Sequence, residues 1–207
     1  MSLKLPRGLY GLIDDGVRPD LSVVDKARAA LAGGAHVLQL RLEKTSDRLA
    51  LPIIREVVAM AGQAVVIVND RVDLAKLGGA QGVHLGADDV PIAAAREFLG
   101  PEFLVGATCR SLEDLHAARA AGADHAGVGP IFTTTTKTVA HAPLGLETFA
   151  MIARASPLPV VGIAGVTLSN INQVARAGAW CAAVASGLLD APDISDRAKA
   201  LQAAFFA

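Results

Sequence analysis

Short apolar segments recur along this chain and alternate with helical patterns, and this alternation is the strongest constraint on its fold. Each segment holds five to eight residues and ends near glycine or a small polar residue. We predict that each is a buried strand, because near-continuous apolar runs are typical of parallel sheets covered on both faces. The segments are Leu9–Asp14, His36–Leu42, Ala64–Asp70, Gly82–Gly86, Phe103–Cys109, His125–Phe132, Pro159–Gly165 and Trp180–Ser186.

Segments with apolar residues at three- and four-residue spacing lie between most of these strands, which predicts helices that pack on the sheet. Arg71–Gly78 has room for about two helical turns, and Ser195–Phe206 supplies a last helix. Eight strand–helix units in 207 residues predict a single-domain (β/α)8 TIM barrel over residues 1–207. A doubly wound sheet is the competitor, but it usually has fewer strands and a Gly-rich fingerprint after the first. The other predicted helices are Leu21–Ala32, Asp47–Ala61, Pro91–Leu99, Leu112–Ala121, Glu147–Ala155 and Leu168–Ala177.

Charge and cysteine content exclude several classes of protein. The formal net charge is −1 and the basic residues form no stripe, so we expect no nucleic-acid partner. No window of about 18 residues is free of charges and turn residues, so we expect no membrane span. The first residues lack the apolar core of a signal peptide, and Cys109 and Cys181 are read as buried free thiols. The expected location is therefore the cytoplasm.

Polar residues gather where the predicted strands end. In a (β/α)8 barrel these carboxyl ends form the face that binds ligands. A polar residue at one strand end is explained by termination of the strand, but polar or small residues follow all eight. The set favours a ligand site and includes Asp14, Gln39, Arg41, Asn69, Asp70, His84, Asp88, Thr108 and Ser186.

The segment Gly127–Lys137 combines a strand end with four threonine hydroxyls and one ammonium group. Many donors and a positive charge suit a phosphorylated ligand. A threonine-rich surface turn is the alternative, and the segment alone does not decide between them. Gly165 and Ser186-Gly187 end the last two strands, where barrels of this class often hold phosphate, although glycine also simply permits a turn.

Asp70 and Asp88 end neighbouring strands and could share a hard cation through oxygen ligands. Mg²⁺ usually takes one or two protein carboxylates together with water and substrate phosphate. Aspartates at strand ends also cap helices, so this pair by itself leaves both interpretations open. With a metal present, Arg41 and Lys137 would face the same phosphates, an arrangement suited to stabilising a departing pyrophosphate.

Taken together, these motifs resemble the thiamine phosphate synthase family, and the resemblance runs nearly from end to end. Several motifs in the same order at strand ends are far more specific than any one of them. They are Gln39-Leu-Arg41, Asn69-Asp-Arg-Val-Asp73, Gly82-Val-His-Leu-Gly86 with Asp88-Asp89, Gly127-Val-Gly-Pro-Ile-Phe132, Thr134-Thr-Thr-Lys137 and Pro143-Leu-Gly-Leu-Glu147.

The resemblance implies an enzyme that joins a hydroxymethylpyrimidine pyrophosphate to a thiazole phosphate and releases pyrophosphate. It implies small phosphorylated substrates and Mg²⁺ as cofactor. A homodimer is possible but is not decided by the sequence. Arg41, Lys137 and Thr108, where the family usually has serine, are the expected catalytic residues. The implied sites are the pyrimidine pocket (Gln39, His84, Thr108), the pyrophosphate site (Arg41, Asn69, Lys137), the Mg²⁺ ligands (Asp70, Asp88) and the thiazole phosphate site (Thr134, Thr136, Gly165, Ala185, Ser186).

Glu43 is the main departure from the family pattern, which has Gln-x-Arg-x-Lys on one face of the second strand. Here Glu43 takes the lysine position and Lys44 comes one residue late. Glu43 would repel pyrophosphate unless it turns away to pair with a base, or a bulge brings Lys44 inward. Ala164 replaces the first glycine of a pair, which we take as a mild change. The alternatives are a non-catalytic binder of thiamine or thiazole phosphate and a thiazole tautomerase-like enzyme, which has histidine where this chain has Pro130.

Overall fold

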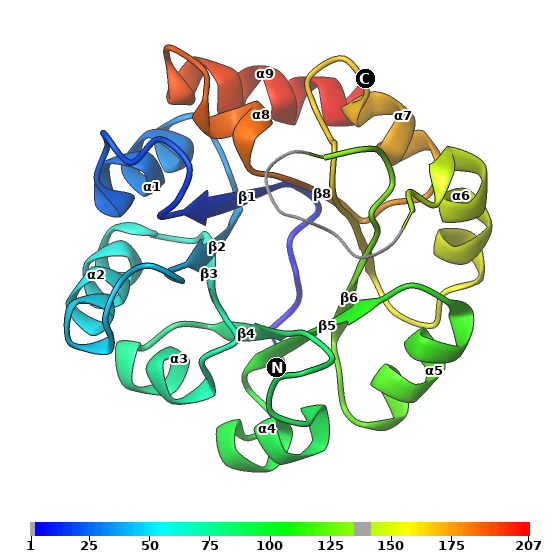
Figure 1. Cartoon of the computed structure of the whole chain (residues 1–207), viewed down its shortest axis with the longest axis horizontal. Coiled ribbons are helices and arrows are strands. Elements are labelled where there is room, and N and C mark those ends of the chain that lie inside the picture. Colours follow the sequence, from blue (N-terminus) through cyan, green and yellow to red (C-terminus); the bar gives the residue numbers. More distant parts are fainter. Residues whose placement is uncertain (1–2, 135–141) are drawn as a thin grey trace.

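The eight strands form a closed, all-parallel barrel in which each strand pairs with the next and β8 pairs with β1 (Figure 1). The computed structural model describes residues 3–134 and 142–207. The predicted (β/α)8 fold is confirmed. The strands are β1 (Gly8–Asp14), β2 (Val37–Arg41), β3 (Val65–Asn69), β4 (Gly82–Leu85), β5 (Leu104–Cys109), β6 (His125–Val128), β7 (Val160–Gly162) and β8 (Cys181–Val184).

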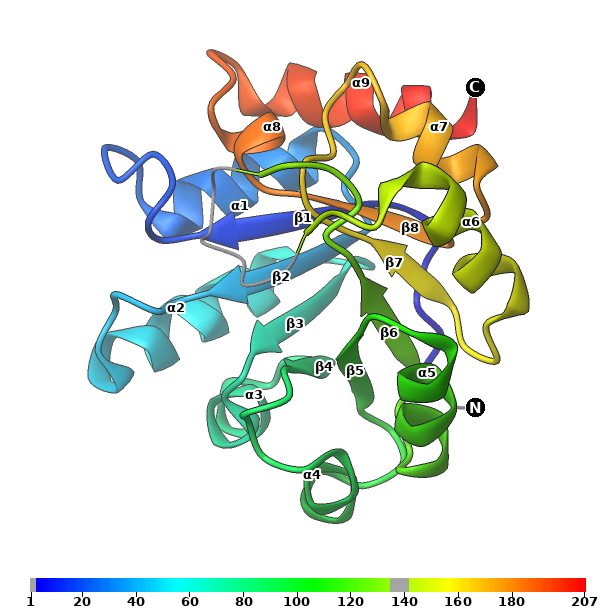
Figure 2. The same cartoon turned by 45° about the vertical axis from the view of Figure 1, so that its right-hand side comes forward.

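Helices surround the barrel and cover the outer face of the sheet, as the turned view also shows (Figure 2). Their apolar stripes and the outward strand residues form the larger buried core, which runs between the two layers. The short connector after β3 is helical as predicted, and one further short helix, α8, follows β8. The helices are α1 (Val23–Ala32), α2 (Asp47–Met60), α3 (Val72–Gly78), α4 (Ile92–Leu99), α5 (Leu112–Ala120), α6 (Gly145–Ala155), α7 (Ile171–Arg176), α8 (Ser186–Leu189) and α9 (Ile194–Phe206).

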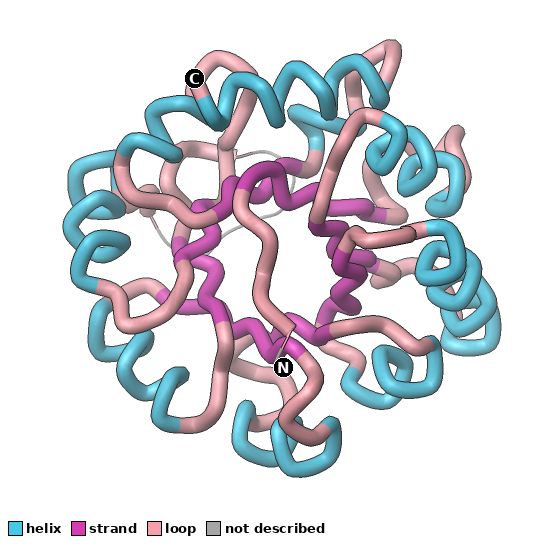
Figure 3. Tube along the Cα trace, turned by 180° about the vertical axis from the view of Figure 1, so that it is seen from behind, coloured by secondary structure: helices cyan, strands magenta, loops and turns pink. Residues whose placement is uncertain are grey.

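A second, smaller core fills the inside of the barrel near the amino ends of the strands. Seen from behind, the segment before β1 crosses this end of the barrel (Figure 3). Leu5 in this segment is buried, and its carbonyl oxygen accepts a 2.8 Å hydrogen bond from Trp180 Nε1. The apolar side chains inside are Leu5, Tyr10, Leu12, Val37, Val65, Ile67, Leu104, Val161, Cys181 and Ala183. The interior of the barrel is therefore closed and packed at its amino end.

The predicted ends of β6, β7 and β8 were wrong by several residues. β6 ends at Val128 rather than Phe132, β7 at Gly162 rather than Gly165, and β8 at Val184 rather than Ser186. Beyond β6 the backbone leaves regular strand geometry but stays attached to the β7 loop, because Ile131 N donates to Ile163 O at 3.0 Å. The extra residues therefore form the rim of the barrel.

Among the described residues, no helix has both the length and the apolar character needed to cross a membrane. Cys109 and Cys181 are free and buried, as predicted. Burial raises the pKa of both thiols, to about 11 for Cys109 and about 12 for Cys181, so neither thiol is ionised at neutral pH.

Candidate active site at the carboxyl end of the barrel

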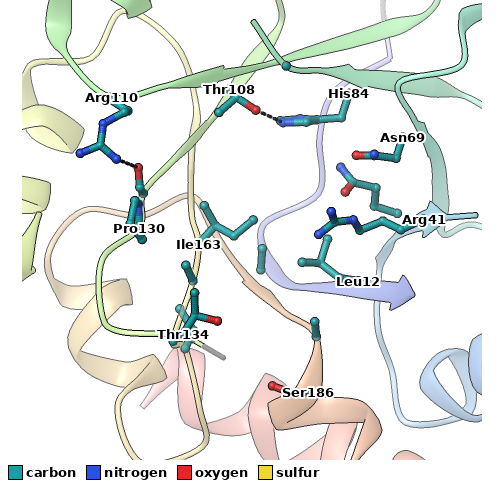
Figure 4. Close-up of a pocket in the computed structure, with 18 of the residues that line it drawn as sticks. Leu12, Arg41, Asn69, His84, Thr108, Arg110, Pro130, Thr134, Ile163 and Ser186 are labelled. Carbon is teal, nitrogen blue, oxygen red and sulfur yellow. Dashed lines mark hydrogen bonds between the residues drawn. The ribbon is translucent and has the colours of Figure 1, made fainter. Parts of the chain in front are cut away.

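A cavity of about 620 Å³ opens at the carboxyl ends of the strands (Figure 4). This size suits a drug-sized or metabolite-sized ligand. Two of the sequence-predicted site residues, Thr136 and Lys137, lie outside the described residues. All the others line the cavity: Gln39, Arg41, Asn69, Asp70, His84, Asp88, Thr108, Thr134, Gly165, Ala185 and Ser186.

Strand periodicity places these side chains. Along β2, Val37 belongs to the inner apolar core, and Gln39 and Arg41 follow at two-residue steps on the same inward face. Along β3, Ile67 and then Asn69 make the same change from apolar to polar. The inward faces of β2 and β3 are thus apolar at the bottom of the barrel and polar at the ligand end.

The floor of the cavity contains neutral polar groups that lie within hydrogen-bond distance of one another. Gln39 is only 4% exposed, and its Nε2 donates a 3.0 Å hydrogen bond to the Tyr10 hydroxyl. Burial raises the pKa of Tyr10 far above its usual range, so this hydroxyl stays protonated. His84 Nε2 lies 3.1 Å from Thr108 Oγ1 (Figure 4), and burial lowers the pKa of His84 to about 4. The floor therefore offers hydrogen bonds without a net charge at neutral pH.

Asp70 and Asp89 bring two carboxyl groups together at the rim. Burial and the hydrogen-bonded carboxyl of Asp89 raise the pKa of Asp70 to about 6. Asp70 adopts a left-handed backbone conformation with φ of 62°, which is uncommon for residues other than glycine and often found at functional sites. Two carboxyl groups in contact must share either a proton or a cation, so this donor set fits a divalent metal ion.

Asp88 and Asp89 both line the cavity, and Asp89 is the one whose carboxyl group hydrogen-bonds that of Asp70. Gly86 N donates a 2.6 Å hydrogen bond to Asp89 Oδ2, which fixes the orientation of that carboxyl group. Sequence reasoning considered the Asp88-Asp89 pair and chose the first residue. Choosing between Asp88 and Asp89 requires knowing which of the two side chains points towards Asp70. Both lie in the loop after β4, where the sequence has no periodic pattern that indicates side-chain direction.

Arg41 is already engaged by carboxylates on two sides. Its Nη2 lies 2.8 Å from Glu43 Oε1, and its Nε lies 3.6 Å from Asp14 Oδ2. Glu43 therefore pairs with the guanidinium group that was predicted to hold pyrophosphate. Lys44 packs against Gly16 in the loop after β1, and its backbone N donates to Asp15 Oδ2 at 2.8 Å. Lys44 does not line the cavity, so it does not take the place of the family lysine.

The opposite side of the cavity is built from backbone and small uncharged residues after β6, β7 and β8 (Figure 4). Gly165 has φ of 69°, and a methyl group there would come within 2.6 Å of Phe132 Cβ and of Thr133 O. Gly165 therefore lines the cavity and also allows its loop to pack closely against the loop after β6. Ala164 also has a left-handed backbone, with φ of 72°. Its replacement of glycine is a strained change rather than a mild one.

Arg110 and Pro130 line the cavity but were not predicted as site residues. Arg110 follows the end of β5, and its Nη1 donates a 3.0 Å hydrogen bond to Gly129 O (Figure 4). A second bond of 3.3 Å, from Nη2, reaches Ala142 O. Arg110 therefore ties the loop after β6 to the cavity wall. Its position directly after a strand end was the signal available in the sequence.

The fold and the site together define a (β/α)8 barrel with a polar cavity at the carboxyl ends of its strands, with carboxylates and a guanidinium group on one side. The family model described as thiamine monophosphate synthase matches residues 9–188. The chain belongs to this family.

Similar proteins cover almost the whole chain. The thiamine-phosphate synthase of Myxococcus xanthus is 55% identical, over 97% of this chain and 93% of that protein. The thiamine-phosphate synthase of Anaeromyxobacter dehalogenans is 49% identical, over 96% and 87% respectively. Among solved structures, the thiamine phosphate pyrophosphorylase from Pyrococcus furiosus superposes with a TM-score of 0.86 at 32% identity, covering 96% of this chain and 95% of that one.

Proposed function

We propose that this protein is a thiamine phosphate synthase. It joins 4-amino-2-methyl-5-hydroxymethylpyrimidine pyrophosphate to 4-methyl-5-(2-phosphoethyl)thiazole and releases pyrophosphate. The observation that carries this proposal is one rim cavity in which a carboxylate–guanidinium cluster faces a wall of small residues across a neutral polar floor. The three parts match a leaving pyrophosphate, a second phosphate and a neutral heterocycle. The relatives with this name support the same reaction.

The pyrophosphate side of the site consists of Arg41, Asn69 and the nearby carboxylates. Asn69 Nδ2 donates a 2.7 Å hydrogen bond to Asp70 Oδ2, which holds that carboxyl group in place. We assign a Mg²⁺ site to Asp70 with Asp88 or Asp89, and the contact between Asp70 and Asp89 favours Asp89. The described residues contain no cluster of three or more His, Cys, Asp or Glu that could hold a metal. Water and substrate oxygens would complete the coordination, as Mg²⁺ prefers.

The remaining residues divide between the two heterocycles. Gln39, His84 and Thr108 form the floor on which we place the pyrimidine ring, because they offer directed hydrogen bonds without charge. Thr134, Gly165, Ala185 and Ser186 form the wall on which we place the thiazole phosphate. Thr136 and Lys137 keep the roles that the resemblance implies, contact with the thiazole phosphate and with the departing pyrophosphate.

The chain orients its two substrates and stabilises charge, and the site needs no strong base. In this mechanism the pyrophosphate leaves first, the aminopyrimidine delocalises the positive charge on its methylene carbon, and the thiazole nitrogen attacks that carbon. Bound Mg²⁺ would neutralise part of the negative charge that grows on the departing oxygens. Arg41 supplies a fixed positive charge at the same place, and the floor residues hold the pyrimidine in line with the attacking nitrogen.

Turnover with both substrates and Mg²⁺ tests this function. We expect equal amounts of thiamine phosphate and pyrophosphate, no product with EDTA, and recovery on adding excess Mg²⁺. Binding of thiazole phosphate without turnover would instead support a non-catalytic binder, whose pyrophosphate site is blocked by Glu43. Conversion of a thiazole isomer alone would support the tautomerase-like alternative, although Pro130 lines the cavity at the position where those relatives have histidine.

The proposal includes a cytoplasmic enzyme of small phosphorylated metabolites. The homodimer stays a prediction, for which light scattering of the purified protein is the direct measurement.

A further inference from the structure

Three buried ring nitrogens beneath the cavity have no hydrogen-bond partner among the described residues. They are Nδ1 of His84 and both ring nitrogens of His125. His125 lies on β6 and is 0% exposed, and its ring centroid is 5.9 Å from that of His84. Buried polar atoms in folded proteins nearly always have a partner, so this group requires an explanation. The reaction described above makes no use of His125.

Gly106 on β5 lies between the two rings. A methyl group on Gly106 would come within 2.4 Å of His125 Nε2 and within 2.5 Å of His84 Nδ1. Both nitrogens therefore face the same small space above this glycine. They cannot be further apart than the sum of these two distances, and one water molecule spans such a gap with ordinary hydrogen bonds. Any larger residue than glycine would separate the nitrogens.

We propose that His125 is a positioning residue that fixes the tautomer of His84 through a hydrogen bond across Gly106. His84 Nδ1–H donates and His125 Nε2 accepts, through one water molecule or after a small rotation of either ring. A neutral imidazole carries one N–H, and burial holds the pKa of His84 at about 4 and that of His125 at about 3, so both rings are neutral. A proton on Nδ1 leaves the Nε2 lone pair of His84 directed at Thr108 and the cavity.

The tautomer of His84 matters for the heterocycle, and this consequence depends on the function proposed above. The exocyclic amino group of the pyrimidine is a hydrogen-bond donor and needs an acceptor on the floor of the cavity. In the tautomer fixed by His125, His84 Nε2 is that acceptor once the Thr108 hydroxyl turns its hydrogen away from this nitrogen. In the other tautomer the same atom carries a hydrogen and opposes the amino group. His125 thus favours the pyrimidine substrate without touching it.

Ring-nitrogen NMR of the free protein tests the proposal directly, because protonated and unprotonated imidazole nitrogens differ widely in ¹⁵N shift. We expect His84 in the wild type to carry its proton on Nδ1, with assignment by the His84→Asn variant. His125→Phe should convert His84 to a mixture or to the Nε2–H form. His125→Gln, whose amide can still reach across Gly106, should restore the Nδ1–H form. His116→Phe, on the exposed face of α5, should change nothing.

A wild-type His84 with its proton on Nε2 would overturn the proposal without the need for any variant. An unchanged tautomer in His125→Phe would overturn it as well. In kinetics, His125→Phe should raise KM for the pyrimidine substrate about 2- to 10-fold, the loss of one neutral hydrogen bond. KM for the thiazole phosphate should stay the same, and an equal rise in both would indicate a purely structural role. If the wild type has no turnover, the proposed function fails, and the nitrogen shifts still decide the role of His125.

Discussion

Among the described residues at the rim of the barrel, those after β1 to β4 include charged side chains and those after β6 to β8 are uncharged. The charged half follows β1 to β4 and contains Asp14, Arg41, Asp70 and Asp89. The neutral half follows β6 to β8, where the described cavity residues are Gly129, Pro130, Thr133, Thr134, Ile163, Ala164, Gly165, Val166, Thr167, Ala183, Ala185 and Ser186. The charged half can hold ligands with side-chain charges. The described residues of the neutral half offer backbone amides and hydroxyl groups, with Arg110 at its border after β5, and Lys137, outside the described residues, follows β6.

This difference suits two anions with different fates. A pyrophosphate that departs gains negative charge in the transition state, so groups that respond to charge accelerate the reaction. A phosphate that remains attached keeps its charge, so it needs only a well-shaped and weakly charged site. We therefore expect substitutions in the charged half to lower the rate, and substitutions in the neutral half to affect binding and stability.

Asp70→Asn should have the largest effect. The variant keeps the shape of the side chain but loses the charge that a cation needs, so we expect kcat/KM to fall by about 100-fold or more. Parallel Asp88→Asn and Asp89→Asn variants identify the second ligand, and the contact with Asp70 predicts the larger loss for Asp89. Thermal unfolding of each variant controls for loss of fold. Full activity in Asp70→Asn would remove the metal site from the charged half.

Glu43 should produce the next largest effect, because it competes for the Arg41 guanidinium group. Glu43→Gln should release Arg41, and Glu43→Lys should also restore a positive charge at this place. Its side chain is half exposed, so we expect a gain of about tenfold in kcat/KM rather than more. Lys44→Ala is the matched control and should be nearly silent, since Lys44 packs on the loop after β1. A loss of activity in Glu43→Gln would show that Glu43 positions Arg41 productively.

Gly165→Ala probes the neutral half. The added methyl group meets the backbone of the loop after β6 and forces alanine into a left-handed conformation. We expect about 1–3 kcal/mol of lost stability in urea unfolding, together with weaker thiazole phosphate binding. The rate at saturating substrate should change less than in Asp70→Asn. A pure rate defect with normal binding would contradict the division of the rim.

His125, beneath the junction of the two halves, should make stability depend on pH. Its pKa is about 3 in the folded protein because of burial, against an ordinary value near 6.5. Below pH 6.5 this histidine is protonated in the unfolded chain but stays neutral in the folded chain. The unfolding free energy that depends on His125 is therefore fully present above pH 6.5 and decreases as the pH falls towards 3. At pH 5 the loss is about 2 kcal/mol. His125→Phe should make this slope shallower in urea unfolding, and the slope that remains comes from His84, whose pKa burial lowers to about 4. His116→Phe, on the exposed face of α5, is the matched control.

Ala164→Gly should have the smallest effect. The residue already adopts a left-handed backbone, which costs alanine about 1–2 kcal/mol, and glycine recovers this at an entropic cost of about 0.5–1 kcal/mol. We expect a gain of up to about 1 kcal/mol in unfolding free energy and unchanged kinetics. A destabilised variant would mean that the loop after β7 relies on the methyl group for packing.

The sequence determined the barrel and the identity of most residues at its mouth. Apolar periodicity reports burial, and in a parallel barrel burial fixes which strand residues face inward and which end of each strand meets solvent. Gln39, Arg41, Asn69 and His84 could therefore be placed at the cavity from their positions in the strands alone, and the structure puts them there.

Only the tertiary structure decided which loop side chains meet. The contact of Asp70 with Asp89 rather than Asp88, and the pairing of Glu43 with Arg41, depend on loop backbone angles that no periodic pattern encodes. The left-handed backbone of Ala164 is likewise a loop conformation, and the two ring nitrogens meet over Gly106 only because β4, β5 and β6 pair in this register. The period of two along a strand indicates which way a side chain points. A contact between two loops has no such pattern, because it depends on how all the loops of the rim pack together.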